Sequence, residues 1–149
     1  MGFQCGISNQ SPECVAIGTQ SGEINQNTAS IAIGTRAGQN SQGLNSVAIG
    51  FQSGQDGQGS YSVAVGYGAA TYTQNEKSVA IGFEAGRTSQ SANCVSIGYN
   101  SGYINQGTDS ISIGTDAGGT SQGYSSISIG TSAGSNNQAH STIAIGYYA

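Results

Sequence analysis

Residues that could act as acids, bases, nucleophiles or metal ligands are few in this sequence and share no recurring pattern. The chain has one histidine, His140, and three cysteines, Cys5, Cys14 and Cys94, with no CxxC pair among them. A zinc site needs cysteine or histidine ligands in closer, paired spacing. The seven acidic residues are scattered, so they predict neither a paired acid and base nor a triad around the histidine. We therefore expect a protein that is not an enzyme and that uses no metal or cofactor.

Charge is sparse and weakly acidic along the whole chain. Three basic and seven acidic residues give a net charge of −4. A nucleic-acid-binding protein needs clustered Lys and Arg to neutralise phosphates, so nucleic acid is not an expected partner. No apolar run approaches the ~18 residues that suggest a membrane span. The first residues also lack the basic and apolar segments of a signal peptide.

The dominant feature is a 16-residue repeat. Glycine recurs at this interval from Gly2 to Gly146 without insertion or deletion, and it closes the motif Ser-Val-Ala-Ile-Gly, as at residues 46–50 and 78–82. A fixed short period is typical of a solenoid, in which each repeat forms one coil. The sequence predicts an all-β parallel β-solenoid of about nine coils, with two short strands per coil, as one domain over residues 1–149.

One strand per coil is predicted from Val or Ile at positions two residues apart. β-branched residues with a period of two favour a strand and share one of its faces. Because this is the most apolar part of the coil, we expect that face to be the interior. The central part of the core ladder comprises Val47, Ile49, Val63, Val65, Val79, Ile81, Val95 and Ile97.

The residue between the two β-branched positions is always Ala or Ser. Alternation along a strand would place it on the outer face. A strip of small residues allows another chain to approach closely, so we expect a lateral protein–protein interface there. The strip comprises Ala16, Ala32, Ala48, Ala64, Ala80, Ser96, Ser112, Ser128 and Ala144.

Glutamine fills one column of the repeat. Identical amides stacked at the ~4.8 Å spacing of strands can hydrogen-bond along the axis as a ladder. We expect this ladder to face inward or to bridge a corner, and the alternative is a binding surface. The column comprises Gln26, Gln42, Gln58, Gln74, Gln90, Gln106, Gln122 and Gln138.

Two glycines per coil, such as Gly50 and Gly54, are interpreted as two corners of the coil. The column that contains Arg87 and Tyr103 varies freely and is interpreted as a solvated loop.

Aromatic residues follow the first glycine in four consecutive coils and should stack as one ridge. An exposed ridge would be a candidate adhesive patch, whereas the alternative is packing at a corner or a subunit seam. The ridge comprises Phe51, Tyr67, Phe83 and Tyr99.

Neither end of the sequence shows an atypical capping coil. A bare terminal coil leaves an open sheet edge onto which another coil can pair. A contact of this kind does not close on itself, so we expect chains to stack head to tail into a filament. The axial interface would comprise Met1, Gly2, Phe3, Ile145, Tyr147 and Tyr148.

The motif Asn-Ser-Val-Ala-Ile-Gly-Phe-Gln-Ser at residues 45–53 resembles the YadA-like head repeat of trimeric autotransporter adhesins. Related repeats occur in fibre proteins of phages and giant viruses. The resemblance extends over all 149 residues, with a period slightly longer than the family's usual one. It implies a left-handed parallel β-roll, commonly trimeric, that is displayed outside the cell and often adheres to matrix or host surfaces.

These observations favour a structural β-solenoid that self-assembles, by head-to-tail stacking of coils, into an extracellular, cell-surface or virion-surface fibre. The alternative is an adhesin head, likewise a homo-oligomer, that binds a host or matrix surface ligand through the flank of the solenoid. A minor alternative is an ice-binding solenoid. That function needs a flat array of threonines, and the aromatic residues interrupt the column that contains Thr19 and Thr35.

Overall fold

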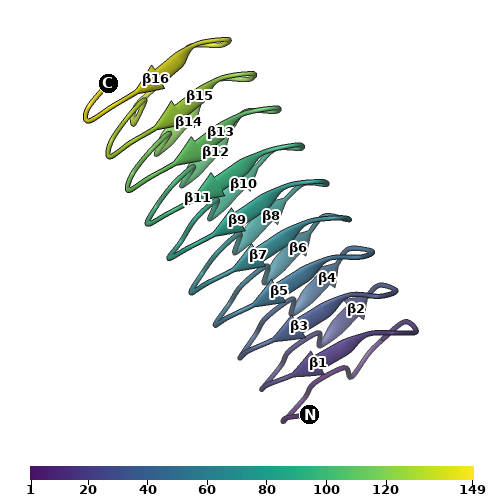
Figure 1. The fold of residues 1–149 in the computed structure, drawn as a ribbon. Coiled ribbons are helices and arrows are strands. Elements are labelled where there is room, and N and C mark those ends of the chain that lie inside the picture. Colours follow the sequence, from purple (N-terminus) through teal and green to yellow (C-terminus); the bar gives the residue numbers. More distant parts are fainter.

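The computed structural model describes all 149 residues as a straight stack of coils, with the N- and C-termini at opposite ends (Figure 1). It contains sixteen strands of three residues each and no helix, hence none that could cross a membrane. The strands form two parallel sheets, one of nine strands and one of seven. The all-β parallel solenoid predicted from the 16-residue period is therefore confirmed.

The nine-stranded sheet consists of β1 (Val15–Ile17), β3 (Ile31–Ile33), β5 (Val47–Ile49), β7 (Val63–Val65), β9 (Val79–Ile81), β11 (Val95–Ile97), β13 (Ile111–Ile113), β15 (Ile127–Ile129) and β16 (Ile143–Ile145). The seven-stranded sheet consists of β2 (Ile24–Gln26), β4 (Asn40–Gln42), β6 (Asp56–Gln58), β8 (Tyr72–Gln74), β10 (Thr88–Gln90), β12 (Ile104–Gln106) and β14 (Thr120–Gln122). Isolated bridges, Ser8 with Ile24 and Thr120 with Asn136, extend the second sheet by one coil at either end.

Every coil pairs with the next in register. Val47 lies opposite Val63 and Ala48 opposite Ala64, as the constant period requires. The main-chain hydrogen bonds continue through the corners, where the amide of Gly50 donates to the carbonyl of Ile33 at 2.8 Å. Each column of the repeat is therefore a continuous line of side chains parallel to the solenoid axis.

The prediction that the Val and Ile columns line the interior is wrong. Their side chains project from the outer face of the nine-stranded sheet, and Ile49, Ile81 and Ile97 are 37–39% exposed. The same outward, half-buried or exposed position holds for the whole predicted core ladder: Val47, Ile49, Val63, Val65, Val79, Ile81, Val95 and Ile97.

The Ala and Ser strip is correspondingly inside the coil, so it cannot be the lateral interface that the sequence predicted. Seven of its members are fully buried within one chain: Ala32, Ala48, Ala64, Ala80, Ser96, Ser112 and Ser128. Ala16 and Ala144, in the end coils, are half-buried. The physical reason is space, because a Cβ atom on Gly54 across the interior would lie only 3.4 Å from the Cβ atom of Ala48. A coil this narrow has no room for Val or Ile.

The two glycines of each coil flank a single corner, and not two. Gly50 and Gly54 have φ angles of +126° and +54° and bound the turn at residues 51–54. A side chain on Gly50 would overlap the carbonyl oxygen of Gly66 in the next coil, so glycine permits the close axial stacking here. The second corner lies at residues 60–61, where Tyr61 adopts the left-handed conformation with a φ of 59°.

Candidate interaction surfaces

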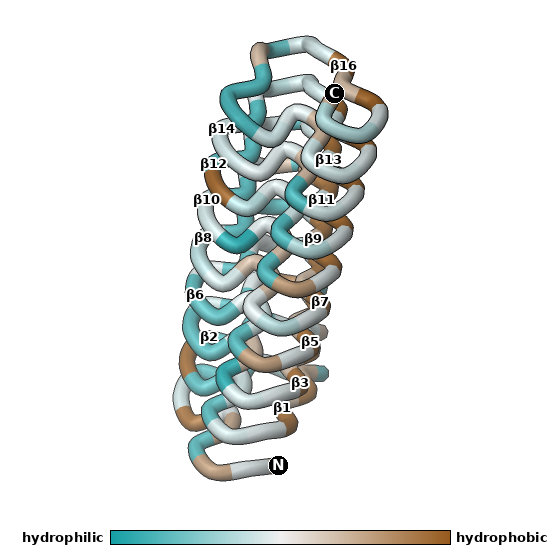
Figure 2. The backbone as a smooth tube through the Cα atoms, turned by 90° about the vertical axis from the view of Figure 1, so that its left-hand side faces the viewer, coloured by the Kyte–Doolittle hydropathy of each residue, from teal (hydrophilic) through white to brown (hydrophobic).

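The outer face of the nine-stranded sheet is a continuous apolar surface, which we call the Val/Ile face. Each of its strands presents two β-branched side chains outward, and no charged residue occupies either column. Figure 2 shows the hydrophobic segments recurring coil after coil along this sheet. An uninterrupted apolar surface of this extent is typical of a protein–protein interface.

The aromatic ridge runs along one edge of the Val/Ile face. The rings of Phe51, Tyr67, Phe83 and Tyr99 stack with centroids 5.0–5.2 Å apart and interplanar angles of at most 16°. Each ring is 40–50% exposed. The ridge is thus both stacked along the axis and accessible to solvent in the single chain.

The glutamine column lies in the interior and not on a binding surface. The Nε2 group of Gln58 donates to the carbonyl oxygens of Val47 (2.8 Å) and Ser62 (3.5 Å), so each amide ties the second sheet to the corner and to the first sheet. Direct bonds between successive amides join Gln10 to Gln26, Gln74 to Gln90 and Gln90 to Gln106, at 3.0–3.2 Å. The axial ladder expected from the sequence is therefore made at only some coils, and bonds to the main chain dominate.

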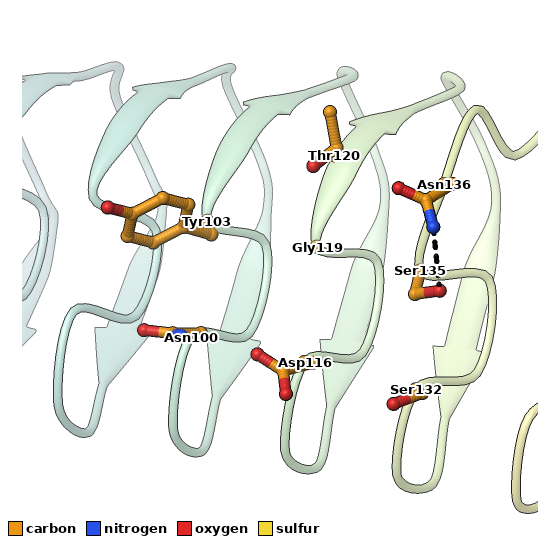
Figure 3. A pocket seen from close by; sticks show the side chains of 8 residues that line it. All are labelled: Asn100, Tyr103, Asp116, Gly119, Thr120, Ser132, Ser135 and Asn136. Atoms are coloured by element: carbon orange, nitrogen blue, oxygen red, sulfur yellow. Dashed lines mark hydrogen bonds between the residues drawn. The ribbon is translucent and has the colours of Figure 1, made fainter.

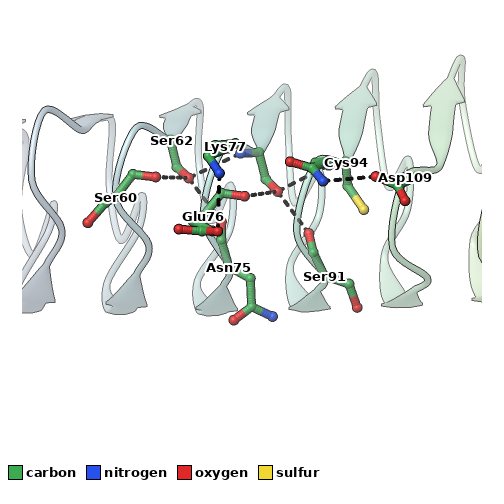
Figure 4. Close-up of polar contacts among 10 residues, drawn as sticks. Ser60, Ser62, Asn75, Glu76, Lys77, Ser91, Cys94 and Asp109 are labelled. Carbon is green, nitrogen blue, oxygen red and sulfur yellow. Dashed lines mark hydrogen bonds and ion pairs between the residues drawn. The ribbon is translucent and has the colours of Figure 1, made fainter.

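The serines that open each motif form a second polar line, at the corner near residue 61 (Figure 4). The hydroxyl of Ser78 donates to the carbonyl of Ser91 at 2.8 Å and accepts from the amide of Cys94 at 3.2 Å. Cys94 takes the place of a serine in this line, and its thiol donates to the carbonyl of Gly107 at 3.0 Å. Burial raises the pKa of the Cys94 thiol.

The titratable side chains that the sequence singled out lie apart from one another. No group of three or more His, Cys, Asp or Glu residues is placed to hold a metal ion. All three cysteines are free thiols. The imidazole of His140 stacks on the ring of Tyr124 with centroids 4.0 Å apart, and its Nδ1 accepts a hydrogen bond from the Tyr124 amide.

A charged and aromatic cluster lies where the corner turns lead into the seven-stranded sheet, in a column that the sequence identifies only as loop. The Arg87 guanidinium donates to the hydroxyl of Tyr103, lies 5.5 Å from that ring's centroid and contacts Glu84 at 3.7 Å. The hydrogen bond that Arg87 donates to Tyr103 is the main cause that raises the pKa of Arg87. The only sequence signal is that Arg87 and Tyr103 stand one period apart, hence side by side.

Next to this cluster, a polar hollow of about 260 Å³ opens around Gly119. Figure 3 shows Tyr103 at one end and Ser135 and Asn136 at the other, with Asp116 below Gly119. Most of the lining residues come from the corner turns and from the first residues of the seven-stranded sheet. The sequence predicted no hollow here.

Comparison with known proteins identifies the repeat. Residues 58–85 match the family model of the YadA head domain repeat in two copies. No significant match to the chain was found among the curated proteins or the solved structures. The matched residues include β7, β8 and β9, which pair in parallel and in register with the neighbouring strands on both sides. Residues 58–85 therefore carry two copies of the YadA head domain repeat, within a solenoid that keeps the same 16-residue period throughout.

Proposed function

We propose that the chain is the head of a surface adhesin, in which three copies pack their Val/Ile faces against one another. The observation that carries the proposal is the continuous apolar face itself. YadA-like heads are trimeric parts of cell-surface adhesins, which supports self-association and display outside the cell. The contact would be lateral, between the flanks of parallel solenoids.

The energetics of the single chain favour such a contact. Its buried apolar side chains are only alanines and Cys94, so one chain has little hydrophobic core of its own. Full burial of a Val or Ile side chain contributes roughly 1.5–3 kcal/mol, and in the central coils Ile49, Ile81 and Ile97 of the Val/Ile face are still 37–39% exposed. Association would therefore add about 0.5–1 kcal/mol for each outward Val or Ile, before the cost of bringing the chains together.

The aromatic ridge is the surface that we assign to a host or matrix ligand. It borders the Val/Ile face and keeps its rings 40–50% exposed in the single chain. Exposed aromatic side chains are enriched at recognition sites, because they offer a large rigid contact area. In the assembled head the ridge would lie at the margin of the contact, where a ligand can reach it.

The oligomeric state tests the assembly. We expect the purified chain to sediment as a trimer at tens of micromolar, and the double variant Ile49→Asp with Ile81→Asp to sediment as a monomer with its β-sheet circular dichroism retained. Burying six carboxylates in the contact among three chains would cost more than the contact provides. The matched control carries Ile24→Asp and Tyr72→Asp, which replace residues of similar exposure on the other sheet and should leave the trimer intact.

Two results would overturn the lateral trimer. One is a wild-type chain that stays monomeric at these concentrations. The other is filament formation that persists in the Ile49 and Ile81 double variant, which would support axial stacking through Met1 and Ile145 instead.

A further inference from the structure

The hollow around Gly119 owes its existence to one missing side chain. The preceding coils fill the same column with Arg87 and Tyr103, and the following coil fills it with Ser135. Because coils are spaced ~4.8 Å apart, the absent side chain leaves a gap on the order of 10 Å between Tyr103 and Ser135. The floor of this gap is the main chain of Gly119, which Figure 3 shows in the middle of the ring of lining side chains.

The aromatic wall of the hollow is fixed before any ligand arrives. Arg87 lies over the Tyr103 ring, 5.5 Å from its centroid, and donates to its hydroxyl. The carboxylate of Glu84 contacts the guanidinium at 3.7 Å. A ring clamped in this way loses little side-chain entropy when a ligand packs on it.

The remaining walls are polar. Seven of the eight lining residues are not hydrophobic, and they offer hydroxyl, amide and carboxylate groups. Asp116 is the only ionisable carboxyl among them, and it takes part in neither of the chain's two ion pairs, Lys77 with Glu76 and Arg87 with Glu84. The Nδ2 group of Asn136 contacts the hydroxyl of Ser135 at 3.3 Å, which orients both groups at the far end.

This chemistry selects the class of ligand. One carboxylate supplies too few negatively charged oxygen atoms to hold a hard divalent cation. An anion would be repelled by Asp116. A pyranose ring has apolar C–H faces that pack on an aromatic ring and a rim of hydroxyls that both donate and accept hydrogen bonds. A small pocket with one aromatic wall and several polar groups suits such a molecule.

We propose that the hollow around Gly119 binds a neutral hexopyranose residue, with Tyr103 against one face of the sugar and Asp116 accepting from its hydroxyls. The proposal adds a ligand class to the proposed head function, but the site lies within one chain and needs no trimer. Its lining residues come from the corner turns and from the seven-stranded sheet side, and none belongs to the Val/Ile face, so the proposed trimer contact does not use them.

Binding is tested with methyl glycosides of glucose, galactose and mannose, by saturation-transfer difference NMR on the purified chain. At least one should give transfer to its ring protons with millimolar affinity. Gly119→Gln should abolish the signal, because it fills the hollow with a side chain that the same column carries at Gln39 and Gln55. Gly119 does not have a positive φ, and a Cβ atom there would lie 3.3 Å from the carbonyl oxygen of Asp116, so the turn has to adjust slightly to accept the side chain. Asp116→Asn should weaken binding by about tenfold or more.

The matched control is Gly57→Asn, which changes a distant exposed glycine to the residue found in the same column at Asn25 and Asn105 and should leave binding unchanged. No transfer to any of the three glycosides, or full binding by Gly119→Gln, would overturn the proposal. Stronger transfer to methyl glucuronoside than to the neutral sugars would also overturn it. Sedimentation of the same samples distinguishes a failure of sugar binding from a failure of trimer assembly, since Gly119→Gln should not change the oligomeric state.

Discussion

The interior of the solenoid is built differently in its N-terminal and C-terminal halves. From β1 to β9 the inward residue of the nine-stranded sheet is alanine, and from β11 to β15 it is serine. The change occurs between Ala80 and Ser96, and both residues are fully buried. The two halves otherwise share the same coil, the same register and the same buried glutamine column.

The added hydroxyl completes the polar network of the C-terminal half. Ser96, Ser112 and Ser128 each donate to the side-chain oxygen of the glutamine ten residues later, at 2.6 Å. In the N-terminal half the corresponding oxygens of Gln42, Gln58 and Gln74 are buried and have no hydrogen-bond partner. Because a buried polar atom without a partner costs roughly 1–3 kcal/mol, the alanine half carries a penalty that the serine half avoids. The comparison shows that the residue type in the Ala or Ser column determines whether the side-chain oxygens of the glutamine column have a hydrogen-bond donor.

The largest expected effect comes from removing the glutamine itself. Gln106→Leu should lower the free energy of unfolding by about 3–5 kcal/mol, because it leaves the hydroxyl of Ser96 and the amide of Gln90 without their acceptor. Gln58→Leu should cost only about 1–3 kcal/mol, because it removes two bonds to carbonyls together with an oxygen that has no partner. Urea unfolding at one fixed protein concentration measures both.

The control for these variants is Gln52→Leu, at a half-buried corner position outside the glutamine column. It should change the unfolding free energy by less than about 0.5 kcal/mol. Equal costs for Gln106→Leu and Gln58→Leu would show that the serine hydroxyls add nothing to the network.

Smaller effects are expected from exchanging the small residues, and the two directions of exchange should have opposite signs. Ser112→Ala removes the donor to the Gln122 oxygen and should destabilise the chain by about 1–3 kcal/mol. Ala48→Ser introduces a donor ten residues before Gln58 and should stabilise it by about 0.5–1.5 kcal/mol. Native-state hydrogen exchange of the amides in the affected coils locates each change, since stability in a solenoid is a sum over neighbouring coils.

Destabilisation by both substitutions would contradict this interpretation. It would show that the interior near Ala48 is too tight for a hydroxyl, and hence that packing rather than hydrogen bonding separates the two halves.

The strands, their pairing and their register were accessible from the sequence, but the direction of each face was not. An unbroken period fixes that Val47 pairs with Val63, and alternation fixes that Val47 and Ile49 share one face while Ala48 takes the other. Nothing in a three-residue strand says which face is inside. The width of the coil decides this, and the small residues at Ser53 and Gly54 were the available sign of a narrow interior.

The two candidate ligand sites also differ in whether the sequence could predict them. The aromatic ridge could be predicted, because a shared column at a constant period must stack along the axis, as Phe51 and Tyr67 do. The hollow could not, because it depends on one residue, Gly119, whose significance appears only once Tyr103 and Ser135 are known to lie on either side of it.

The smallest expected effect concerns Cys94, which opens the coil where alanine gives way to serine. Burial raises the pKa of its thiol, so the folded chain keeps this proton at a pH where the unfolded chain, with an ordinary cysteine pKa of about 8.5, has released it. The contribution of the neutral thiol to stability is thus complete below about pH 8.5 and is lost as the pH rises toward the folded-state pKa. In a background with Cys5→Ser and Cys14→Ser, the unfolding free energy of the Cys94 protein should fall more steeply above this pH than that of the Cys94→Ser variant. The excess slope is at most one proton, about 1.4 kcal/mol per pH unit. Parallel pH profiles for the two proteins would mean that the thiol is hydrated, and the boundary between the two halves would then be a point where water enters the interior rather than a dry junction.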